Sequence, residues 1–451
     1  MLYRQQTIAA RATPPGTGAI HIVRISGPDT AQVLAALMPG KAEISQTHTL
    51  KLRKLYAGNK LIDEALVAVF KAPESFTGED AAELYLHGSE FITNQIMQEL
   101  ISLGVRLADP GEFTMRAYLN GKLDLAQAEA VADLIAAQSE GSHKLAMNQL
   151  KGGISAKISE MRSSLLEFAA LIELELDFGE EDVEFANREK LLEMLMHLLN
   201  EVEMLLASFK SGNAIRDGIP VAIVGRPNAG KSTLLNVILN EERAIVTDIP
   251  GTTRDTIEEY FVHEGLRYRL IDTAGIRDAT DKVEAIGIER TFKSAEKAAL
   301  IWLVFDVQDD ASEIQETLVK LRQNGEAEIW LLANKSDLTT NKNQNNFTEK
   351  TIYISAKNNE LGNLFEHLST YGKSILAEAS DTTISNLRHY EVLKNAKTEL
   401  QKVVKAIHQK DTSDLLAFDL RQAMTELGKI TGVIDTEDIL GEIFSKFCIG
   451  K

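Results

Sequence analysis

The sequence predicts a multidomain α+β protein in which an all-helical domain is interrupted by an inserted α/β domain. Three changes of pattern along the 451 residues indicate this architecture. Short apolar stretches broken by turn residues fill residues 1–118, helical periodicity fills 119–217 and 378–451, and strand and helix patterns alternate over 218–377. The two helical segments are expected to pack together as one domain on either side of the insertion.

Residues 1–118 are expected to form a mixed α+β domain. AIHIVRISGP (19–28) is typical of a strand that ends at Gly-Pro, and LIDEALVAVF (61–70) and AELYLH (82–87) are typical of further strands. Apolar residues at helical spacing predict a helix over 91–103. The first 28 residues hold three arginines and no acidic residue, yet they lack the apolar core of a signal peptide and have the strand and turn pattern of folded protein.

From Leu123 the composition shifts toward Ala, Leu, Gln and Glu, and amphipathic helices are predicted up to about Lys210. SGNAIRDGIP (211–220) is predicted as a loop, because Ser, Gly, Asn and Pro favour turns. Five short apolar strands then alternate with helical stretches, which predicts a parallel sheet with helices on both faces. These strands are VAIVG (221–225), YRLID (268–272), LIWLVFD (300–306), EIWLLAN (328–334) and TIYIS (351–355).

Composition excludes several classes of protein. The net charge of −18 argues against a broad surface for nucleic acid, so any RNA contact must come from a local patch or through a partner. The acidic segment 160–210 is most simply a set of solvated helix faces. No apolar run reaches the roughly 18 residues of a membrane helix, so no membrane association is expected. A single cysteine excludes an intramolecular disulfide framework and suits a reducing cytoplasm.

GRPNAGKS (225–232) follows an apolar strand directly and opens a helix, which is the context that a phosphate-binding loop requires. Its glycines let backbone N–H groups close around phosphate oxygens, and the helix N-terminus adds partial positive charge. We expect Lys231 to reach the β- and γ-phosphates and Ser232 to ligate Mg²⁺. A glycine turn of structural use alone is the competing interpretation.

Four further motifs follow in the order that a GTPase requires. TTRD (252–255) supplies Thr253 as a second magnesium ligand, which is ordered when the γ-phosphate is present. DTAG (272–275) brings an aspartate toward the metal's water shell and a glycine N–H toward the γ-phosphate. NKSD (334–337) places a carboxylate where guanine, unlike adenine, offers two N–H donors, and SAK (355–357) closes over the base.

Each motif alone is a weak match, and NKSD or SAK by itself would more often be an ordinary polar turn. Their order and their positions after strands predict a Ras-like α/β P-loop G domain that binds GTP. The residues expected around GTP are Asn228, Ala229, Gly230, Lys231, Ser232, Thr233, Thr247, Asp248, Ile249, Pro250, Gly251, Thr252, Thr253, Asp272, Thr273, Ala274, Gly275, Asn334, Lys335, Asp337, Ser355, Ala356 and Lys357.

Two details distinguish this site from that of a Ras-like enzyme. Ile276 follows the DTAG glycine where a Ras-like enzyme places a glutamine, and an aliphatic side chain cannot polarise water. The phosphate loop also contains Asn228, whose simplest alternative role is a loop hydrogen bond. Similarity to potassium-activated GTPases implies that Asn228, with oxygens of Thr247, Ile249 and Thr252, holds K⁺ beside the β–γ bridge in place of an arginine finger.

Together with their flanking stretches, these motifs resemble the MnmE (TrmE) family of tRNA-modification GTPases over essentially the whole chain. The five GTPase motifs are shared with many proteins, whereas the flanking stretches are much more specific. The resemblance is carried by ATPPGTGAIHIVRISG (12–27), FTGEDAAEL (76–84), PGEFTMRAYLNGKLDLAQAEAVADLI (110–135), VTDIPGTTRD (246–255) and FCIGK (447–451).

The resemblance implies that the N-terminal domain mediates a homodimer and binds 5-formyl-tetrahydrofolate or a related one-carbon folate. Arg24, Glu83, Lys122 and Lys451 match the family's folate contacts. A glutamate suits the N–H donors of a pterin, and arginine or lysine suits carboxylates. Without the resemblance, Arg24 and Lys122 would be ordinary surface charges.

The resemblance also assigns roles to residues near the nucleotide and at the C-terminus. Glu284 is implied to orient or activate water, Arg254 and Arg277 to stabilise loops, and Cys448 to act in the modification site. The alternatives are a glutamate that suits the first turn of a helix and a cysteine that fills apolar space. The last two residues, Gly and Lys, exclude a prenylation signal at Cys448.

The activity implied is potassium-activated GTP hydrolysis that drives G-domain dimerisation. It would support aminomethyl or carboxymethylaminomethyl addition at carbon 5 of the wobble uridine of tRNA. The implied partner is the FAD-dependent MnmG (GidA) in a cytoplasmic heterotetramer, which can carry the main tRNA contacts. A regulatory ribosome-associated GTPase switch is the alternative; it would share the five motifs but not the N-terminal block or FCIGK. A scaffold that binds GTP without hydrolysis is disfavoured by the intact Lys231, Ser232, Thr253 and Asp272.

Overall fold

The computed structural model describes residues 6–39, 47–177, 187–241, 259–271, 296–323, 327–338, 347, 349–433, 437–445 and 447–450. The chain divides into two compact units, each assembled from segments that are distant in the sequence. The first unit comprises Met1–Ile135, Gln149–Leu198 and Asn395–Lys451, and the second comprises Ala136–Asn148 and Leu199–Lys394.

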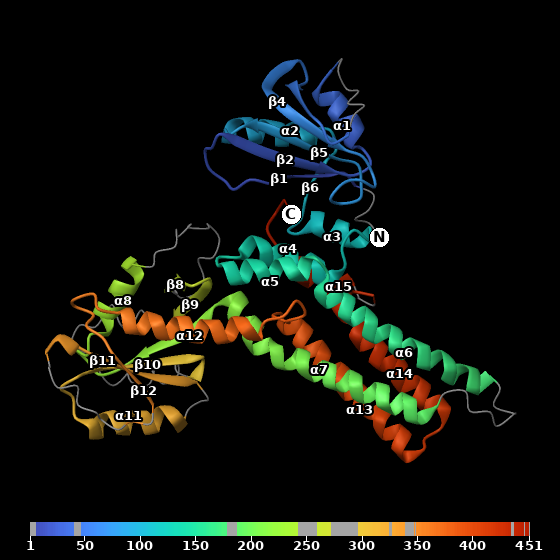
Figure 1. Ribbon diagram of the computed structural model, residues 1–451. Coiled ribbons are helices and arrows are strands. Elements are labelled where there is room, and N and C mark those ends of the chain that lie inside the picture. The colour runs from blue at the N-terminus through green and yellow to red at the C-terminus, as the bar shows by residue number, and fades with distance from the viewer. Residues whose placement is uncertain are drawn as a thin grey trace. The chain divides into compact units, whose positions relative to one another are not determined.

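A six-stranded sheet forms the N-terminal part of the first unit, in the order β3-β4-β5-β2-β1-β6 (Figure 1). Helices α1 (Thr30–Leu37) and α2 (Glu90–Ser102) bury apolar side chains against it. The three strands and the helix expected here are confirmed, whereas β1, β3 and β6 had not been predicted. The strands are β1 (Ile8–Arg11), β2 (Ile20–Ser26), β3 (Leu50–Ala57), β4 (Lys60–Phe70), β5 (Ala81–His87) and β6 (Arg106–Leu107).

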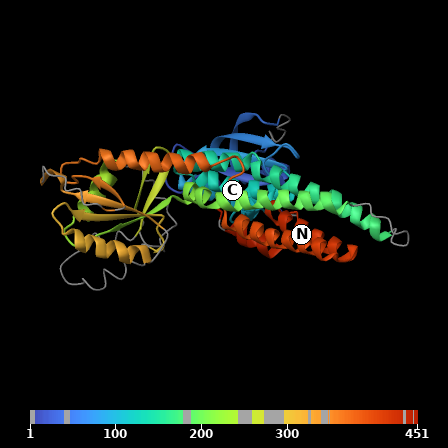
Figure 2. The ribbon, with the colours of Figure 1, turned by 60° about the horizontal axis from the view of Figure 1, so that its bottom comes forward.

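Helices make up the rest of the first unit. α6 and α14 pack along each other, and α3 contacts α15, so helices before and after the insertion pack together as expected (Figures 1 and 2). Apolar residues of α4 and α15 share a small core with Phe447. The helices are α3 (Glu112–Leu119), α4 (Leu125–Ala136), α6 (Gly153–Asp177), α14 (Ser413–Thr431), α15 (Glu437–Ser445), the first part of α7 (Arg188–Asp217) and the last part of α13 (Leu387–Gln409).

The second unit contains a six-stranded sheet in the order β12-β11-β10-β7-β9-β8. Neighbouring strands pair in parallel except at one edge, where β8 is antiparallel to β9. The five strands predicted for this sheet are therefore confirmed as parallel neighbours, and β8, which had not been predicted, adds an antiparallel edge. Glu264 and Gly265 form a two-residue turn with φ values of 43° and 79°, and such a turn joins antiparallel strands. The strands are β7 (Ile219–Val224), β8 (Glu259–His263), β9 (Leu266–Ile271), β10 (Leu300–Asp306), β11 (Glu328–Asn334) and β12 (Lys350–Tyr353).

Helices cover both faces of this sheet, as predicted. α11 (Ala311–Gln323) and α12 (Gly362–Glu378) lie on opposite faces in both views (Figures 1 and 2). α12 and α8 (Lys231–Glu241) share a core with Trp302 and Trp330, whereas α11 packs on the other face. α5 (Glu140–Leu150) adds Leu145 to the first of these cores. Within the described part of the chain, no helix is both long and apolar enough to cross a membrane.

The segment 211–220, predicted as a loop, is instead the end of α7 and the start of β7. Gly212 lies inside α7, where an added Cβ would be 2.1 Å from the carbonyl oxygen of Ile384. The glycine therefore allows another segment of backbone to cross the helix closely, and tertiary packing overrides its weak helical propensity.

Candidate functional site

The carboxyl ends of four parallel strands gather the predicted nucleotide motifs at one edge of the second sheet. β7 leads into the phosphate loop, β11 ends at Asn334, and β12 leads to Ser355. β10 ends at Asp306, directly in register with Asn334. Ligands of parallel α/β sheets bind outside this edge, so the fold brings the phosphate and base loops to a common place.

The loop between β7 and α8 turns through three positive φ values: 152° at Gly225, 63° at Asn228 and 96° at Gly230. A Cβ on Gly225 would lie 2.1 Å from the carbonyl oxygen of Val304, and one on Gly230 would lie 2.2 Å from Nδ2 of Asn334. Both positions therefore require glycine. Asn228 adopts the left-handed conformation that asparagine tolerates better than most residues.

Lys231 is the first residue of α8, and its side chain folds back over the loop. Its Nζ donates hydrogen bonds of 2.7 Å to the carbonyl oxygens of Gly225 and of Arg226. Burial lowers the pKa of this ammonium group. Ser232 and Thr233 follow in the same exposed first turn. The helix N-terminus thus presents an ammonium group, hydroxyls and backbone N–H groups, which together suit a phosphate.

Asn334 links the phosphate loop to the SAK segment. Its Nδ2 donates to the carbonyl oxygen of Ala229 at 2.9 Å, and its Oδ1 accepts from the N–H of Ala356 at 3.0 Å. All three residues are buried. Because one planar amide fixes both loops, the phosphate and base positions are held at a set separation.

Asp337 stands exposed in the short 3-10 helix Ser336–Leu338. The Ser355 hydroxyl donates to its Oδ1 at 2.6 Å, and this bond, aided by the charge of Lys357, holds the pKa of the carboxyl below its usual value. Lys335 pairs with Asp306 at 2.7 Å. An ionised carboxylate held in this way can accept the two N–H donors of guanine.

Part of the expected site lies outside the described residues, and the roles predicted there stay predictions. The phosphate loop and the base loops can be placed, while the loops that would flank the γ-phosphate cannot. The expected residues concerned are Thr247, Asp248, Ile249, Pro250, Gly251, Thr252, Thr253, Arg254, Asp272, Thr273, Ala274, Gly275, Arg277, Glu284 and Lys451.

A second polar cluster lies on the N-terminal sheet, where Arg24 of β2 and Glu83 of β5 are register partners. Nε of Arg24 donates to Glu83 Oε1 at 2.7 Å, and the Tyr85 hydroxyl donates to Glu83 Oε2 at 2.6 Å. The bond to Glu83 is the main reason that the pKa of Tyr85 rises to about 12. Two of the expected folate contacts therefore meet in the structure.

The C-terminal segment is seated beside this cluster. Arg24 Nη1 donates to the carbonyl oxygen of Gly450 at 3.3 Å. The N–H of Gly111 donates to the carbonyl oxygen of Cys448, also at 3.3 Å. Gly450 has φ 89°, and a Cβ there would lie 2.4 Å from the carbonyl oxygen of Arg11. Cys448 is exposed, so it is not a buried filler. The described part of FCIGK therefore lies against the N-terminal domain.

Lys122, the remaining expected folate contact, lies against the loop that precedes β5. Its Nζ donates to the carbonyl oxygen of Pro73 at 3.0 Å. Sequence reasoning missed Asp306 and Tyr85. Asp306 could have been found from its place at the end of a buried strand, and Tyr85 from its spacing of two from Glu83, which puts both on one face of a strand.

Comparisons with known proteins agree with this arrangement. A family model described as "MnmE helical domain" matches residues 125–448, and one described as "GTP-binding protein TrmE N-terminus" matches residues 7–122. Proteins named tRNA modification GTPase MnmE from Christiangramia forsetii and Cytophaga hutchinsonii are 46% and 45% identical. The alignments cover 99% of this chain and 99% and 98% of those proteins, respectively.

Similarity to solved structures is more partial. The G domain of FeoB from Methanococcus jannaschii matches 35% of this chain and 98% of its own length, with 22% identity and a TM-score of 0.24. The two family models and the full-length relatives, by contrast, extend over nearly every described element. The chain belongs to the MnmE (TrmE) family.

Proposed function

We propose that this chain is a potassium-activated GTPase that modifies carbon 5 of the wobble uridine of tRNA together with an FAD-dependent partner. Its relatives are named tRNA modification GTPases. The observation that carries the proposal is the double hydrogen bond of Asn334, which holds a phosphate-binding loop and a base-binding segment together. Such an arrangement suits a purine nucleoside triphosphate better than a lone phosphate.

Guanine is the base that suits the site. The hydrogen bond from Ser355 lowers the pKa of Asp337, whose carboxylate would serve as a pure acceptor for the base. Guanine offers adjacent N–H donors there, whereas adenine offers none as a pair. At the other end, Lys231 would exchange its two carbonyl acceptors for phosphate oxygens, which bind an ammonium group more strongly.

The oxygen donors around Lys231 and Asn228 fit the expected cations. Ser232 lies in the first turn of α8 with a hydroxyl oxygen, the ligand type that Mg²⁺ prefers. Asn228 offers an amide oxygen at the left-handed turn of the loop. Ser232 and Thr253 would hold Mg²⁺, and Asn228, Thr247, Ile249 and Thr252 would hold K⁺. The cations would supply charge stabilisation for phosphoryl transfer.

The residues of the chain would then divide the remaining work. Lys231 fixes the phosphates, and Asn334 fixes the distance from phosphate to base. Glu284 is proposed to orient the attacking water, since Ile276 cannot do so. Cys448 is proposed to act in the modification site rather than in GTP hydrolysis, and its exposure is compatible with that role.

The Arg24–Glu83 pair supports a site for a formyl-tetrahydrofolate. The chemistry of the donor set fits, because Glu83 can accept pterin N–H groups while Arg24 and Lys122 can pair with carboxylates. Arg24 also holds the backbone of Gly450, so the cluster adjoins the segment that carries Cys448. A one-carbon donor bound here would lie near the thiol that we assign to the modification site.

Homodimerisation through the N-terminal domain is supported by an apolar row on its sheet. Leu52, Leu66, Tyr85 and Ile22 are register neighbours across β3, β4, β5 and β2, and Leu52 and Leu66 are 56% and 40% exposed. Such a patch favours a protein interface. Leu66→Lys should shift the protein toward monomer in analytical ultracentrifugation. Val319→Lys, at an exposed apolar position of α11, should leave the oligomeric state unchanged.

The redox step would come from the partner MnmG (GidA) in a cytoplasmic heterotetramer. The net charge of −18 agrees with a division of labour in which the partner makes most tRNA contacts. Deletion of residues 448–451 should abolish modification and spare GTP hydrolysis. The activity of a ribosome-associated switch would be unchanged by this deletion, because that activity needs only the nucleotide site.

The decisive test compares GTP turnover in K⁺ and in Na⁺ at equal ionic strength. We expect strong stimulation by K⁺ that Asn228→Ala removes, while GDP affinity changes little. Equal turnover in both salts would overturn the potassium mechanism. Absence of turnover in either salt, with or without the partner, would overturn the GTPase assignment itself.

A further inference from the structure

The end of α13 reverses the sign of charge that prevails in this acidic chain. Residues 397–410 contain four lysines and a single acid, Glu399, whereas the whole chain has a net charge of −18. Lys402, Lys405 and His408 follow each other at intervals of three and are all exposed. Side chains at this spacing adjoin on the surface of a helix, so the two lysines and the histidine form a continuous exposed row.

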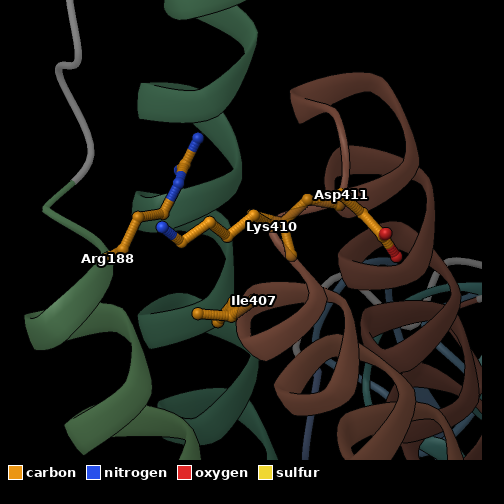
Figure 3. Close-up of a pocket in the computed structure, with 5 residues that line it drawn as sticks. Arg188, Ile407, Lys410 and Asp411 are labelled. Carbon is orange, nitrogen blue, oxygen red and sulfur yellow. The ribbon is translucent and has the colours of Figure 1, made fainter.

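A pocket of about 320 Å³ lies beside the C-terminal end of α13 (Figure 3). Lys410 extends toward the helix that carries Arg188, whereas the carboxylate of Asp411 points away from it (Figure 3). Lys410 and Arg188, of which Arg188 is paired with Glu175, therefore border one pocket whose lining also includes two apolar side chains. Its lining residues are Arg188, Ile407, Lys410, Asp411 and Leu416.

The guanidinium group of Arg188 is oriented by two hydrogen bonds. Its Nη2 donates to Oε2 of Glu175 at 2.5 Å and to the hydroxyl of Ser413 at 3.0 Å. Glu175 is only 8% exposed, so a buried carboxylate orients Arg188 rather than a mobile surface one. An oriented arginine loses less entropy when it binds an anion, and its planar donors match a phosphate.

We infer that the row Lys402–Lys405–His408 and the Arg188–Lys410 pocket, here called the basic edge, bind the phosphate backbone of tRNA. The inference rests on the proposed function and adds the surface through which this chain itself touches the RNA. From Lys402 to Lys410 the chain advances about 12 Å at 1.5 Å per residue. That length is roughly three nucleotides of one strand at 3.4 Å each.

A phosphodiester strand suits this surface better than an acidic protein does. A phosphodiester strand presents single anionic oxygens at regular intervals, as the lysines present single cations, and it needs no apolar complement beyond the pocket. Lys402 is partly compensated by Glu399 at 2.9 Å, so Lys405 and Lys410 should contribute most. These two residues therefore make the sharper test.

The test measures binding of an unmodified tRNA transcript to the full chain, alone and with its FAD-dependent partner, over a series of salt concentrations. The variant is Lys405→Gln with Lys410→Gln. Its control is Lys320→Gln with Lys373→Gln, which removes the same charge from lysines of the second unit that are 57% and 72% exposed. Thermal unfolding and GTP turnover verify that both variants fold.

Loss of two phosphate contacts should weaken binding and make the slope of log K against log salt shallower by roughly 1.4–1.8. The control should match the unsubstituted protein. Equal slopes for variant and control would overturn the inference, as would loss of partner binding with tRNA affinity intact, which would assign the basic edge to an acidic protein surface. Absence of tRNA binding by the unsubstituted complex would instead overturn the proposed function.

Discussion

Asn334→Ala should uncouple the two halves of the nucleotide site. The substitution removes the Nδ2 donor of the Ala229 carbonyl and the Oδ1 acceptor of the Ala356 N–H, which lie at 2.9 and 3.0 Å. Both backbone groups belong to buried residues, and a buried group without a partner costs about 1–3 kcal/mol. Taking the low end of this range for each of the two groups, the total is about 2–3 kcal/mol. That loss corresponds to a roughly 30- to 150-fold rise in Kd.

Isothermal titration with GDP and with a non-hydrolysable GTP analogue measures the effect, and thermal unfolding shows what part of it appears as lost stability. Both nucleotides should weaken equally, because both span the loops that Asn334 joins. Asn363→Ala is the matched control, since the exposed Asn363 amide makes a long 3.5 Å contact with the carbonyl oxygen of Tyr353. Unchanged affinity and unfolding temperature in Asn334→Ala would refute the reasoning.

Three further predictions test the nucleotide site and the N-terminal domain. Lys231→Ala should abolish binding of fluorescent GDP, because it removes the ammonium group at the start of α8; retained affinity would contradict this. Asp337→Asn should shift preference toward xanthosine triphosphate in competition assays, since the amide can donate to the 2-oxo group, and persistent guanine preference would exclude the assigned role. Bonds from Gly16 and Arg11 lower the pKa of Glu90 below 4.5, so its stabilising effect is present above that pH and lost as the pH falls further. In Glu90→Gln, the free energy of unfolding, measured with urea, should therefore fall less steeply as the pH is lowered. An equally steep fall in the variant would contradict a stabilising role of the ionised Glu90.

Local chemistry explains why the phosphate loop could be predicted from the sequence. Any Cβ at its glycines would make contacts under 2.5 Å, so only glycine fits there. Such a requirement can be recognised from the residue type alone. The antiparallel edge strand β8 has a weaker sequence signal, which is the two-residue turn Glu264–Gly265, and it was not predicted. Pairing between strands is not local, so β1 and β3 could be recognised only once their partners were placed.

The Arg24–Glu83 cluster shows a different limit. These residues are distant in the sequence and meet because β2 and β5 pair in one register. A shift of that register by one residue would turn one of the two side chains to the opposite face of the sheet. Nothing within either strand specifies this register by itself, so the pair was expected only through resemblance to a family. Tyr85, which no resemblance suggested, depends on no register, because it lies two residues from Glu83 on the same face of β5.

The segment 211–220 was predicted as a loop because of its composition. The same composition allows another segment of backbone to cross α7 closely. Ser208 accepts a hydrogen bond from the N–H of Ile384 at 3.2 Å, and Arg216 donates to the carbonyl oxygen of Ser385 at 3.2 Å. Between them, Gly212 permits backbone contact that any larger residue would block. The segment that leads into β7 is thus fastened to the segment that leads out of α12. Because these contacts tie the two connections together, we expect a displacement of one connection to displace the other.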